Sequence, residues 1–302
     1  MKYYSYSFPD ESSKKAFAVF CEDKFRNSLD KAAEAALMRD NLRFIALSGP
    51  TCSGKTTTAG MLIDKLKATG KDVKVISIDD FFLNRETLAA EAKKSGVPID
   101  LDSVKAIDME ELRFFVNGIE RLEPLRLPAF DFTLGKRAGY TELLPTEKDI
   151  FIFEGIQAVY PEVTALFEPK HLLKIYISVE NGIDTPYGSW LPREIRLLRR
   201  IVRDSRIRNT DAETTFSHWD GVIANELVNI EPYKDSCDIK IDSGMAYEIS
   251  VLKKPLMTLL EQIRESSSYY LKSKMLIEKL RDFPDIDEKY VPKDSVLREF
   301  IG

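Results

Sequence analysis

The chain has 302 residues and a formal net charge of −5, with 44% hydrophobic and 31% charged residues. This is the ordinary composition of a soluble protein with one large domain or two smaller ones, and it allows a sizeable core. The negative charge excludes a general attraction to nucleic acid or to an anionic membrane, so any anion site must be local. The sequence has no run of about 18 apolar residues and no signal-peptide pattern, so we expect a cytoplasmic location.

The first predicted element is a long helix. Residues 11 to about 40 carry Ala, Leu, Phe, Lys and Glu at helical spacing, with Ala32, Ala36 and Leu37 as examples, and no glycine interrupts them. We therefore expect residues 1–42 to form a helical N-terminal extension that leads into the core.

The segment Gly49–Thr56 (GPTCSGKT) matches the P-loop pattern at every required position. The apolar run Arg43–Ser48 predicts a strand before it, and Thr57–Thr69 has the periodicity of a helix after it. In this setting the loop N–H groups surround phosphates, Lys55 reaches the outer two and Thr56 ligates Mg²⁺. We therefore predict binding of ATP or GTP with Mg²⁺. The predicted nucleotide site consists of Gly49, Pro50, Thr51, Cys52, Ser53, Gly54, Lys55, Thr56 and Thr57.

The three cysteines, Cys21, Cys52 and Cys237, are widely spaced and form no metal-binding pattern, which suits a reducing cytosol. Cys52 differs from the other two because it lies inside the glycine loop. It is either a tolerated loop residue or a thiol whose oxidation lowers activity.

Four further apolar runs predict strands, and helical stretches separate them. This order is typical of an α/β P-loop NTPase fold, a parallel sheet with helices on both faces that binds its ligands at the carboxyl ends of the strands. The four runs are Val73–Ile78, Ile150–Phe153, Leu173–Ser178 and Asp238–Asp242.

Two of these runs deliver carboxylates at their ends. Phosphoryl transfer needs a phosphate cradle, a metal, a proton acceptor and positive charge. Asp79 either accepts the proton of the acceptor hydroxyl or holds Mg²⁺, and Glu154 is the better metal-shell carboxylate. Asp80 is expected to point to the opposite face of the strand. The alternative is that these acids cap helices or are solvated loop charges.

The segment 84–149 reads as an irregular insertion with Pro98, Pro124, Pro128 and Pro145. A long insertion between core strands usually carries function or forms a lid. We therefore expect the substrate-binding part of a kinase core, residues 43–245, to lie here.

Residues 193–208 contain seven arginines in an otherwise acidic chain. Apolar residues fall at helical spacing and form one face, so the pattern is either a solvated amphipathic helix or a mobile arginine lid over about 191–211 that closes on phosphates. The apolar residues are Leu191, Ile195, Leu198 and Val202, which leaves Arg196, Arg199, Arg200 and Arg203 on neighbouring faces.

The C-terminal extension, residues 246–302, carries one long helical pattern that breaks at Pro284, followed by a polar stretch and Leu297–Ile301. The terminal helices either pack on the core or serve a homo-oligomer.

With these motifs in order, the chain resembles the uridine kinase family of P-loop kinases (uridine kinase and phosphoribulokinase-like) over about residues 43–245. Four segments carry the resemblance: Ser77–Phe82, Leu101–Asp108, Phe153–Ile156 and Arg196–Asp204. The resemblance implies that Asp79 is the general base, Asp102 holds the ribose hydroxyls and Glu154 is associated with magnesium. It also assigns Arg200, Arg203 and Arg208 to phosphates and substrate.

The segment Phe130–Arg137 departs from the family at the base-reading positions. Pyrimidine nucleoside kinases carry Tyr and His where this chain has Phe130 and Gly135, while Arg137 is retained. The polar groups that would hydrogen-bond uracil or cytosine are therefore missing. Phe130 and Arg137 remain the expected substrate-binding residues.

Later in the chain, the Arg-Gly-Arg-Asp of the family becomes Arg208–Asp211, and its Gln-Tyr pair becomes His218-Trp219. These two residues form either a packed pair or a stack in the substrate pocket. A bacterial uridine kinase-like subgroup is a closer match, because it shares Gly135–Arg137, the spacing of Asp204 to Arg208 and the ending Ser295–Ile301.

We therefore predict an ATP-dependent kinase that phosphorylates a nucleoside, foremost the 5′-hydroxyl of uridine or cytidine, with Asp79, Lys55 and Arg208 as catalytic residues. One alternative is a P-loop kinase for another small metabolite, such as a sugar phosphate or pantothenate. The other is a regulatory module that binds nucleotide without catalysis.

Overall fold

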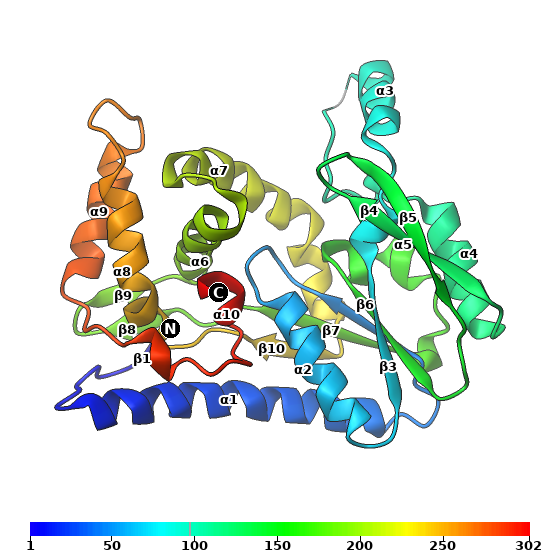
Figure 1. Cartoon of the computed structure of the whole chain (residues 1–302), viewed down its shortest axis with the longest axis horizontal. Coiled ribbons are helices and arrows are strands. Elements are labelled where there is room, and N and C mark those ends of the chain that lie inside the picture. The colour runs from blue at the N-terminus through cyan, green and yellow to red at the C-terminus, as the bar shows by residue number, and fades with distance from the viewer. Residues whose placement is uncertain (97) are drawn as a thin grey trace.

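The computed structural model describes residues 1–96 and 98–302, and its centre is a five-stranded parallel sheet (Figure 1). The strand order is β10-β7-β2-β6-β3, with the P-loop strand β2 in the middle. Each predicted strand is present and ends within one residue of the expected position. Their bounds are β2 Phe44–Ser48, β3 Asp72–Ser77, β6 Asp149–Glu154, β7 Leu172–Ser178 and β10 Ile239–Asp242.

Alternate residues of the strands enter two hydrophobic clusters, one on each face of the sheet. In β2, Ile45 and Leu47 join one cluster, whereas Phe44 and Ala46 join the other. This alternation follows from the period of two in a strand, and apolar residues at every position mean that both faces are covered. The predicted α/β fold with helices on both faces is therefore confirmed.

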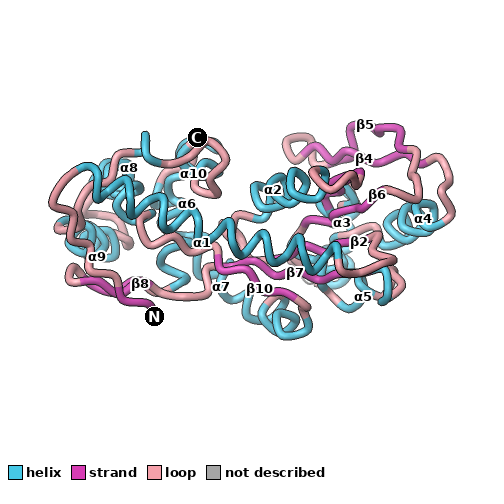
Figure 2. Tube along the Cα trace, turned by 90° about the horizontal axis from the view of Figure 1, so that it is seen from below, coloured by secondary structure: helices cyan, strands magenta, loops and turns pink. Residues whose placement is uncertain are grey.

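The helices divide between the two faces (Figures 1 and 2). On the first face lie α1 (Glu11–Leu37) and α2 (Lys55–Lys67), whose Phe25, Leu29 and Leu62 share the cluster of Ile45. On the second face lie α4 (Met109–Glu120) and the short α5 (Pro161–Thr164). The N-terminal helix is thus part of the main core.

A small second sheet, which the sequence did not reveal, joins the N-terminus to the region after β7. The strand β1 (Lys2–Tyr3) runs parallel to β8 (Ile183–Thr185), which pairs antiparallel with β9 (Gly188–Trp190). These strands have two or three residues each, too short for a periodic pattern to be recognised.

The insertion 84–149 is regular, so the expectation of an irregular segment is wrong. It contains α3 (Arg85–Ser95), α4 and an antiparallel hairpin of β4 (Leu125–Asp131) and β5 (Lys136–Leu143). The prolines wrongly suggested an irregular segment, because Pro124 and Pro145 lie outside the strands and do not interrupt them. Pro128 lies within β4, where a two-stranded ribbon leaves every strand an edge that tolerates proline.

The C-terminal half is helical. It begins with α6 (Pro192–Arg208) and α7 (Ala212–Asn229). The sequence pattern predicts one long helix up to Pro284, but the structure has two helices there, and the first, α8 (Glu248–Glu261), ends well before Pro284. A turn with three consecutive serines, residues 266–268, precedes α9 (Tyr270–Arg281), and serine favours turns. The chain ends with α10 (Arg298–Ile301). In the described part of the chain, no helix combines the length and apolarity that crossing a membrane requires.

Candidate active site

The P-loop joins β2 to α2 and depends on glycine at two points. A Cβ on Gly49 would lie 1.9 Å from the carbonyl oxygen of Ile177 in β7, so only glycine allows this approach. Gly54 has φ +90°, a left-handed conformation that disfavours side chains. Lys55 Nζ donates to the carbonyl oxygens of Gly49 at 2.9 Å and Pro50 at 3.2 Å, which holds its ammonium group over the loop.

A cavity of about 270 Å³ lies in front of the loop and gathers most of the predicted nucleotide and catalytic residues. Its walls come from the P-loop, from the ends of β3 and β6, from α6 and from the C-terminus. The lining residues are Thr51, Cys52, Ser53, Lys55, Thr56, Asp79, Glu154, Gly155, Ile156, Arg203, Arg208 and Glu299.

Asp79 and Glu154 lie on neighbouring strands. Asp79 is in the 3₁₀ turn η1 (Ile78–Phe81) directly after β3, and Glu154 is the last residue of β6, in register with Ser77. Burial raises the pKa of both carboxyls, and the nearby Lys55 opposes that shift. Asp80 is directed elsewhere, since its Oδ1 accepts a hydrogen bond from the Phe130 N–H at 3.1 Å.

The same wall of the cavity fits a magnesium ion. In the described part of the chain, no group of three or more His, Cys, Asp or Glu side chains is placed to hold a metal alone. Thr56, Asp79 and Glu154 instead offer one hydroxyl and two carboxylates to one cavity. Mg²⁺ in phosphate-transfer sites takes one or two carboxylates from the protein and other oxygens from phosphate and water, so this donor set is suitable.

The second half of α6 supplies the positive charge. Arg203 and Arg208 line the cavity, and Arg200 lies one turn before Asp204. All three guanidinium groups contact the single carboxylate of Asp204, at 3.1 Å for Arg200, 3.1 Å for Arg203 and 3.4 Å for Arg208. Burial and the neighbouring arginines Arg203 and Arg200 lower the pKa of Arg208. Such crowding of like charges beside an open cavity is typical of an anion site.

The first half of α6 lies behind the loop. Arg196 donates to the Thr51 carbonyl oxygen at 3.0 Å and pairs with Glu226, while Arg199 donates to the Cys52 carbonyl oxygen at 3.2 Å and pairs with Glu248. Their exposed fractions are 4% and 0%.

The interpretation of this half as a solvated or mobile surface is therefore wrong for Arg196 and Arg199. The two arginines support the P-loop from behind. Their guanidinium groups are bound by carboxylates and not by solvent. Nothing in the local pattern of α6 indicated those partners, because Glu226 and Glu248 belong to α7 and α8.

The residues predicted to hold the acceptor do not line this cavity. Asp102 Oδ2 accepts a hydrogen bond from Asn225 at 2.5 Å, and its backbone carbonyl accepts one from Tyr160 at 3.0 Å. Burial raises the pKa of Asp102, as does Asp100, while Asn225 and Lys55 lower it. Asp102 is thus close enough to Lys55 to interact with its charge.

Phe130 and Arg137 face each other across the hairpin. Phe130 packs edge-on against Phe82 and Phe132, with ring centroids 5.7 and 5.3 Å away. Arg137 forms an ion pair with Asp108 at 2.8 Å, so its guanidinium group already has an acidic partner.

His218 and Trp219 do not form the packed pair that was one of the two expectations. His218 is exposed, whereas Trp219 is buried with the Arg196 guanidinium 5.7 Å from its ring. Consecutive residues of a helix face different directions, which explains the separation. Arg200 also lies over this ring, at 6.0 Å.

Sequence reasoning missed Glu299, which reaches the cavity from the C-terminus. Its Oε2 accepts a hydrogen bond from the Thr57 hydroxyl at 3.2 Å. The only sequence signal was the ending Ser295–Ile301 shared with the bacterial subgroup, which carried no indication of position.

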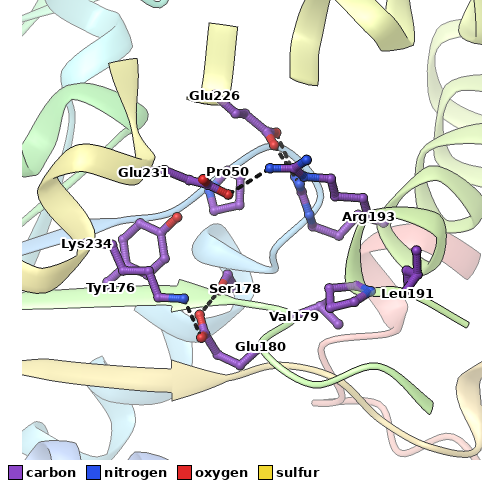
Figure 3. Close-up of a pocket in the computed structure, with 12 residues that line it drawn as sticks. Pro50, Tyr176, Ser178, Val179, Glu180, Leu191, Arg193, Glu226, Glu231 and Lys234 are labelled. Carbon is purple, nitrogen blue, oxygen red and sulfur yellow. Dashed lines mark hydrogen bonds and ion pairs between the residues drawn. The ribbon is translucent and has the colours of Figure 1, made fainter. Parts of the chain in front are cut away.

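A second cavity, of about 330 Å³, lies on the other side of Pro50, at the end of β7 (Figure 3). It is larger, but its charges pair with one another: Lys234 with Glu180 at 2.5 Å, and Arg193 with Glu231 at 2.9 Å. Phosphate binding needs loop N–H groups and more cations than the carboxylates they contact, as where three arginines share Asp204, so the cavity of Lys55 is the candidate active site.

Comparisons with known proteins agree with this geometry. The model of the Phosphoribulokinase / Uridine kinase family matches residues 44–250. A uridine kinase of Lactobacillus helveticus is 26% identical over 222 residues, covering 72% of this chain and 95% of the relative. A uridine kinase of Anoxybacillus flavithermus is 27% identical over 233 residues, covering 74% and 98%.

Among solved structures, the YGR205w protein matches with a TM-score of 0.50 and 18% identity, over 73% of this chain and 89% of that one, a likeness of fold alone. Kinases of the matched family use a nucleoside triphosphate and Mg²⁺ in general. The chain belongs to the phosphoribulokinase / uridine kinase family and is a phosphotransferase that acts on a hydroxyl group.

Proposed function

We propose that the chain transfers the γ-phosphoryl group of ATP to a hydroxyl group of a nucleoside, with the 5′-hydroxyl of uridine or cytidine as the first acceptors to test. The observation that carries this proposal is one cavity shared by Lys55, two strand-end carboxylates and two arginines. The relatives named uridine kinase support a nucleoside as the acceptor.

At the donor end, the N–H groups of the loop and Lys55 bind the phosphates. Glu154 and Thr56 would hold Mg²⁺, which when bound supplies positive charge at the outer phosphates. Arg203 and Arg208 contact the transferring phosphoryl group, whose transition state spreads negative charge over its oxygens. These roles fit the charge distribution, since both arginines share one carboxylate with Arg200.

At the acceptor end, Asp79 accepts the proton of the hydroxyl group. The hydroxyl oxygen forms a bond to the γ-phosphorus as the bond to the bridging oxygen of ADP breaks. Burial raises the pKa of Asp79, and a base works best when its pKa lies close to the working pH. Asp102, held by Asn225, would bind further hydroxyl groups of the acceptor.

Base recognition differs from a pyrimidine-reading pocket in one respect that the backbone explains. Gly135 has φ +66°, and a Cβ there would lie 2.6 Å from Cδ of Arg85. A histidine at this position would therefore strain the backbone and displace the side chain of Arg85. The cluster of Phe82, Phe130 and Phe132 offers aromatic surface in place of polar contacts.

That difference favours one second candidate, a kinase for another small hydroxyl compound such as a sugar phosphate or a pantothenate-like metabolite. A regulatory module without catalysis is less well supported, because Lys55, Asp79 and Glu154 are all present in one cavity.

A panel assay tests these functions. Purified protein with ATP and Mg²⁺ is offered uridine, cytidine, purine nucleosides, sugar phosphates and pantothenate, and ADP release is measured. We expect a pyrimidine nucleoside to stimulate release, and Asp79→Asn to abolish the stimulation while ATP affinity stays within about twofold. Stimulation by a sugar phosphate or pantothenate alone would favour the second candidate. ATP binding without stimulation by any acceptor would favour the regulatory module.

A further inference from the structure

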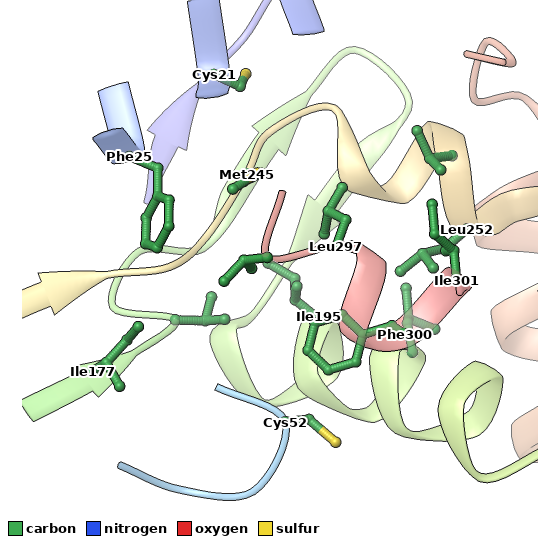
Figure 4. Close-up of a cluster of buried hydrophobic side chains, with 14 of the residues drawn as sticks. Cys21, Phe25, Cys52, Ile177, Ile195, Met245, Leu252, Leu297, Phe300 and Ile301 are labelled. Atoms are coloured by element: carbon green, nitrogen blue, oxygen red, sulfur yellow. The ribbon is translucent and has the colours of Figure 1, made fainter. Parts of the chain in front are cut away.

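The last eight residues, Ser295–Gly302, form a C-terminal segment that is built into the core. Val296, Leu297, Phe300 and Ile301 are each at most 2% exposed. Figure 4 shows Leu297, Phe300 and Ile301 among side chains of α6 and α8, with Cys52 of the P-loop nearby. The segment is therefore a fixed part of the molecule around the loop.

The C-terminal segment touches the P-loop region at three points. A Cβ on Gly54 would lie 2.7 Å from Cγ2 of Val296, so this side chain lies against the loop backbone. Glu299 accepts the hydrogen bond of Thr57. The ring of Phe300 lies 5.0 Å from the guanidinium group of Arg199, which itself holds a loop carbonyl.

Hydrogen bonds made by residues on both sides of Glu299 hold the backbone from which its side chain extends. Ser295 donates to Glu22 of α1 at 2.5 Å, and Tyr247, the residue before α8, donates to the same carboxyl oxygen. Arg298 donates to the carbonyl oxygen of Val291 at 2.6 Å and to that of Gly302 at 3.0 Å. The backbone that carries Glu299 is thus held by α1 and by its own preceding turn.

A carboxylate at this position is unexpected in an anion site. Glu299 lines the cavity together with Lys55, Arg203 and Arg208, and its negative charge adds to the rise in the pKa of Glu154 and of Arg203. It repels phosphate oxygens, and such repulsion is strong in a partly desolvated site. Oε2 already accepts the hydrogen bond of Thr57, and the other carboxyl oxygen is compatible with a bound nucleoside triphosphate only where it meets a hydrogen-bond donor or a cation.

The donors of a nucleoside triphosphate are all in its nucleoside half, as ribose hydroxyls and base N–H groups. The γ-phosphate end is assigned to Lys55, Thr56 and Asp79, so the nucleoside leaves the loop away from Asp79. Glu299 contacts Thr57, one residue beyond Thr56 in α2, and it interacts with Arg203 of α6. The contact with Thr57, the residue that follows the γ-phosphate ligand Thr56, is the reason to expect the inner phosphate and the nucleoside beside Glu299.

We propose that Glu299 recognises the nucleoside half of the phosphate donor, accepting hydrogen bonds from its hydroxyl or amino groups, and that the C-terminal segment is part of the donor site. This inference rests on the proposed function, because it takes ATP as the donor. It adds a specificity-determining residue that lies outside the P-loop, the strand ends and α6.

The test compares binding of ATP and inorganic tripolyphosphate by isothermal titration calorimetry in the presence of Mg²⁺ and without acceptor. Tripolyphosphate offers the same phosphates and no nucleoside donors. We expect Glu299→Ala to weaken ATP binding by on the order of tenfold, the loss of one hydrogen bond to a charged group, and to leave tripolyphosphate equal or tighter. Glu299→Gln should lie between the two proteins.

Glu288→Gln is the matched control. Glu288 is an exposed acid of the same C-terminal extension, its carboxylate 3.9 Å from Arg206, and it does not line the cavity. We expect this variant to bind both ligands as the wild type does. Deoxy-ATP analogues and purine riboside triphosphate then identify the group of the nucleotide that donates the hydrogen bond. The analogue that lacks this group should bind the wild type more weakly than ATP does, but should bind Glu299→Ala as tightly as ATP does.

Four results would overturn the inference. Equal tightening of both ligands in Glu299→Ala would make the residue an electrostatic obstruction, and an increased Mg²⁺ requirement for both would make it a metal ligand. Equal weakening of both, with a lower Tm of the free protein, would make it structural. Unchanged ATP affinity would remove it from the site. If the wild type bound no ATP, the proposed function itself would fail instead.

Discussion

The two halves of α6 use the same residue type for opposite purposes. Arg196 and Arg199 are buried, and each pairs with its own carboxylate while donating to a P-loop carbonyl. Arg203 and Arg208 face the cavity, and with Arg200 they share only Asp204. The two halves therefore differ in the number of carboxylates per arginine. One carboxylate for each arginine gives structural support to the P-loop, whereas one carboxylate for three arginines leaves positive charge at the cavity.

The largest effect is expected at the open half. Arg208→Ala removes a cation that we propose to contact the transferring phosphoryl group, and arginines in that role contribute about 10³-fold or more to kcat, equivalent to about 4 kcal/mol. Its side chain is half exposed, so the free energy of unfolding should change by less than about 1 kcal/mol. Steady-state kinetics and urea unfolding of the same sample measure both quantities.

Arg193→Ala is the control for that variant. Arg193 lies on the same helix, forms an exposed ion pair with Glu231 and does not line the cavity of Lys55. Arg193→Ala should change kcat by less than a factor of two and the free energy of unfolding by less than about 0.5 kcal/mol. Equal losses of activity in the two variants would mean that the arginines of α6 act only through net charge.

The next largest effect is expected at the paired half. Arg199→Met leaves Glu248 buried without its cation, and breaking one partner of a buried pair costs about 3–5 kcal/mol of unfolding free energy. The double variant Arg199→Met with Glu248→Gln should recover part of that loss, because no charge then remains unpaired. Urea unfolding of the two variants checks this. A double variant no more stable than the single one would show that the hydrogen bonds to the loop, and not the ion pair, dominate.

The residues that were predicted correctly depend on local patterns. The P-loop, the strand-end positions of Asp79 and Glu154 and the five strands follow from short runs of apolar residues and from one motif. The support of the loop could not be predicted in the same way, because Arg196 and Arg199 need partners on α7 and α8.

Position in space, which no local pattern encodes, explains the other misses. Glu299 reaches the cavity from the far end of the chain. Its position depends on the packing of the C-terminal segment, in which Val296 lies against Gly54 and Phe300 lies against Arg199. The hairpin was missed for a different reason, since Pro128 lowers the strand signal although an edge strand tolerates it.

A smaller effect concerns the pH dependence of catalysis. Asp79 must be ionised to accept a proton, and burial raises its pKa above the ordinary value of about 3.9. Activity should therefore be lost as the pH falls through this raised pKa, at a higher pH than for an exposed aspartate. The acid limb of a kcat/KM profile measures it. An acid limb at the pKa of an exposed aspartate would indicate that the charge of Lys55 outweighs burial.

The smallest effect is expected at Glu22, a buried carboxyl that takes part in none of the ion pairs found among the described residues, unlike Glu226 and Glu248. Burial raises its folded pKa, so its contribution to stability is fully present below the unfolded pKa of about 4.3 and is lost as the pH rises through the folded pKa.

Glu22→Gln should remove that dependence and be more stable than the wild type at neutral pH, because no buried carboxyl then has to ionise. Thermal or urea unfolding from pH 4 to pH 8 measures the difference. A variant that loses stability at every pH by the same amount would indicate that the hydrogen bonds of Ser295 and Tyr247 need an ionised acceptor.

The most direct test of phosphoryl transfer at this cavity follows the γ-phosphoryl group itself. ATP labelled in the γ-phosphate is incubated with the protein, Mg²⁺ and uridine or cytidine, and the label is traced by mass spectrometry in the wild type and in Asp79→Asn. We expect labelled nucleoside 5′-monophosphate with the wild type and none with the variant. Transfer by Asp79→Asn at the wild-type rate, or label found only in inorganic phosphate, would contradict it.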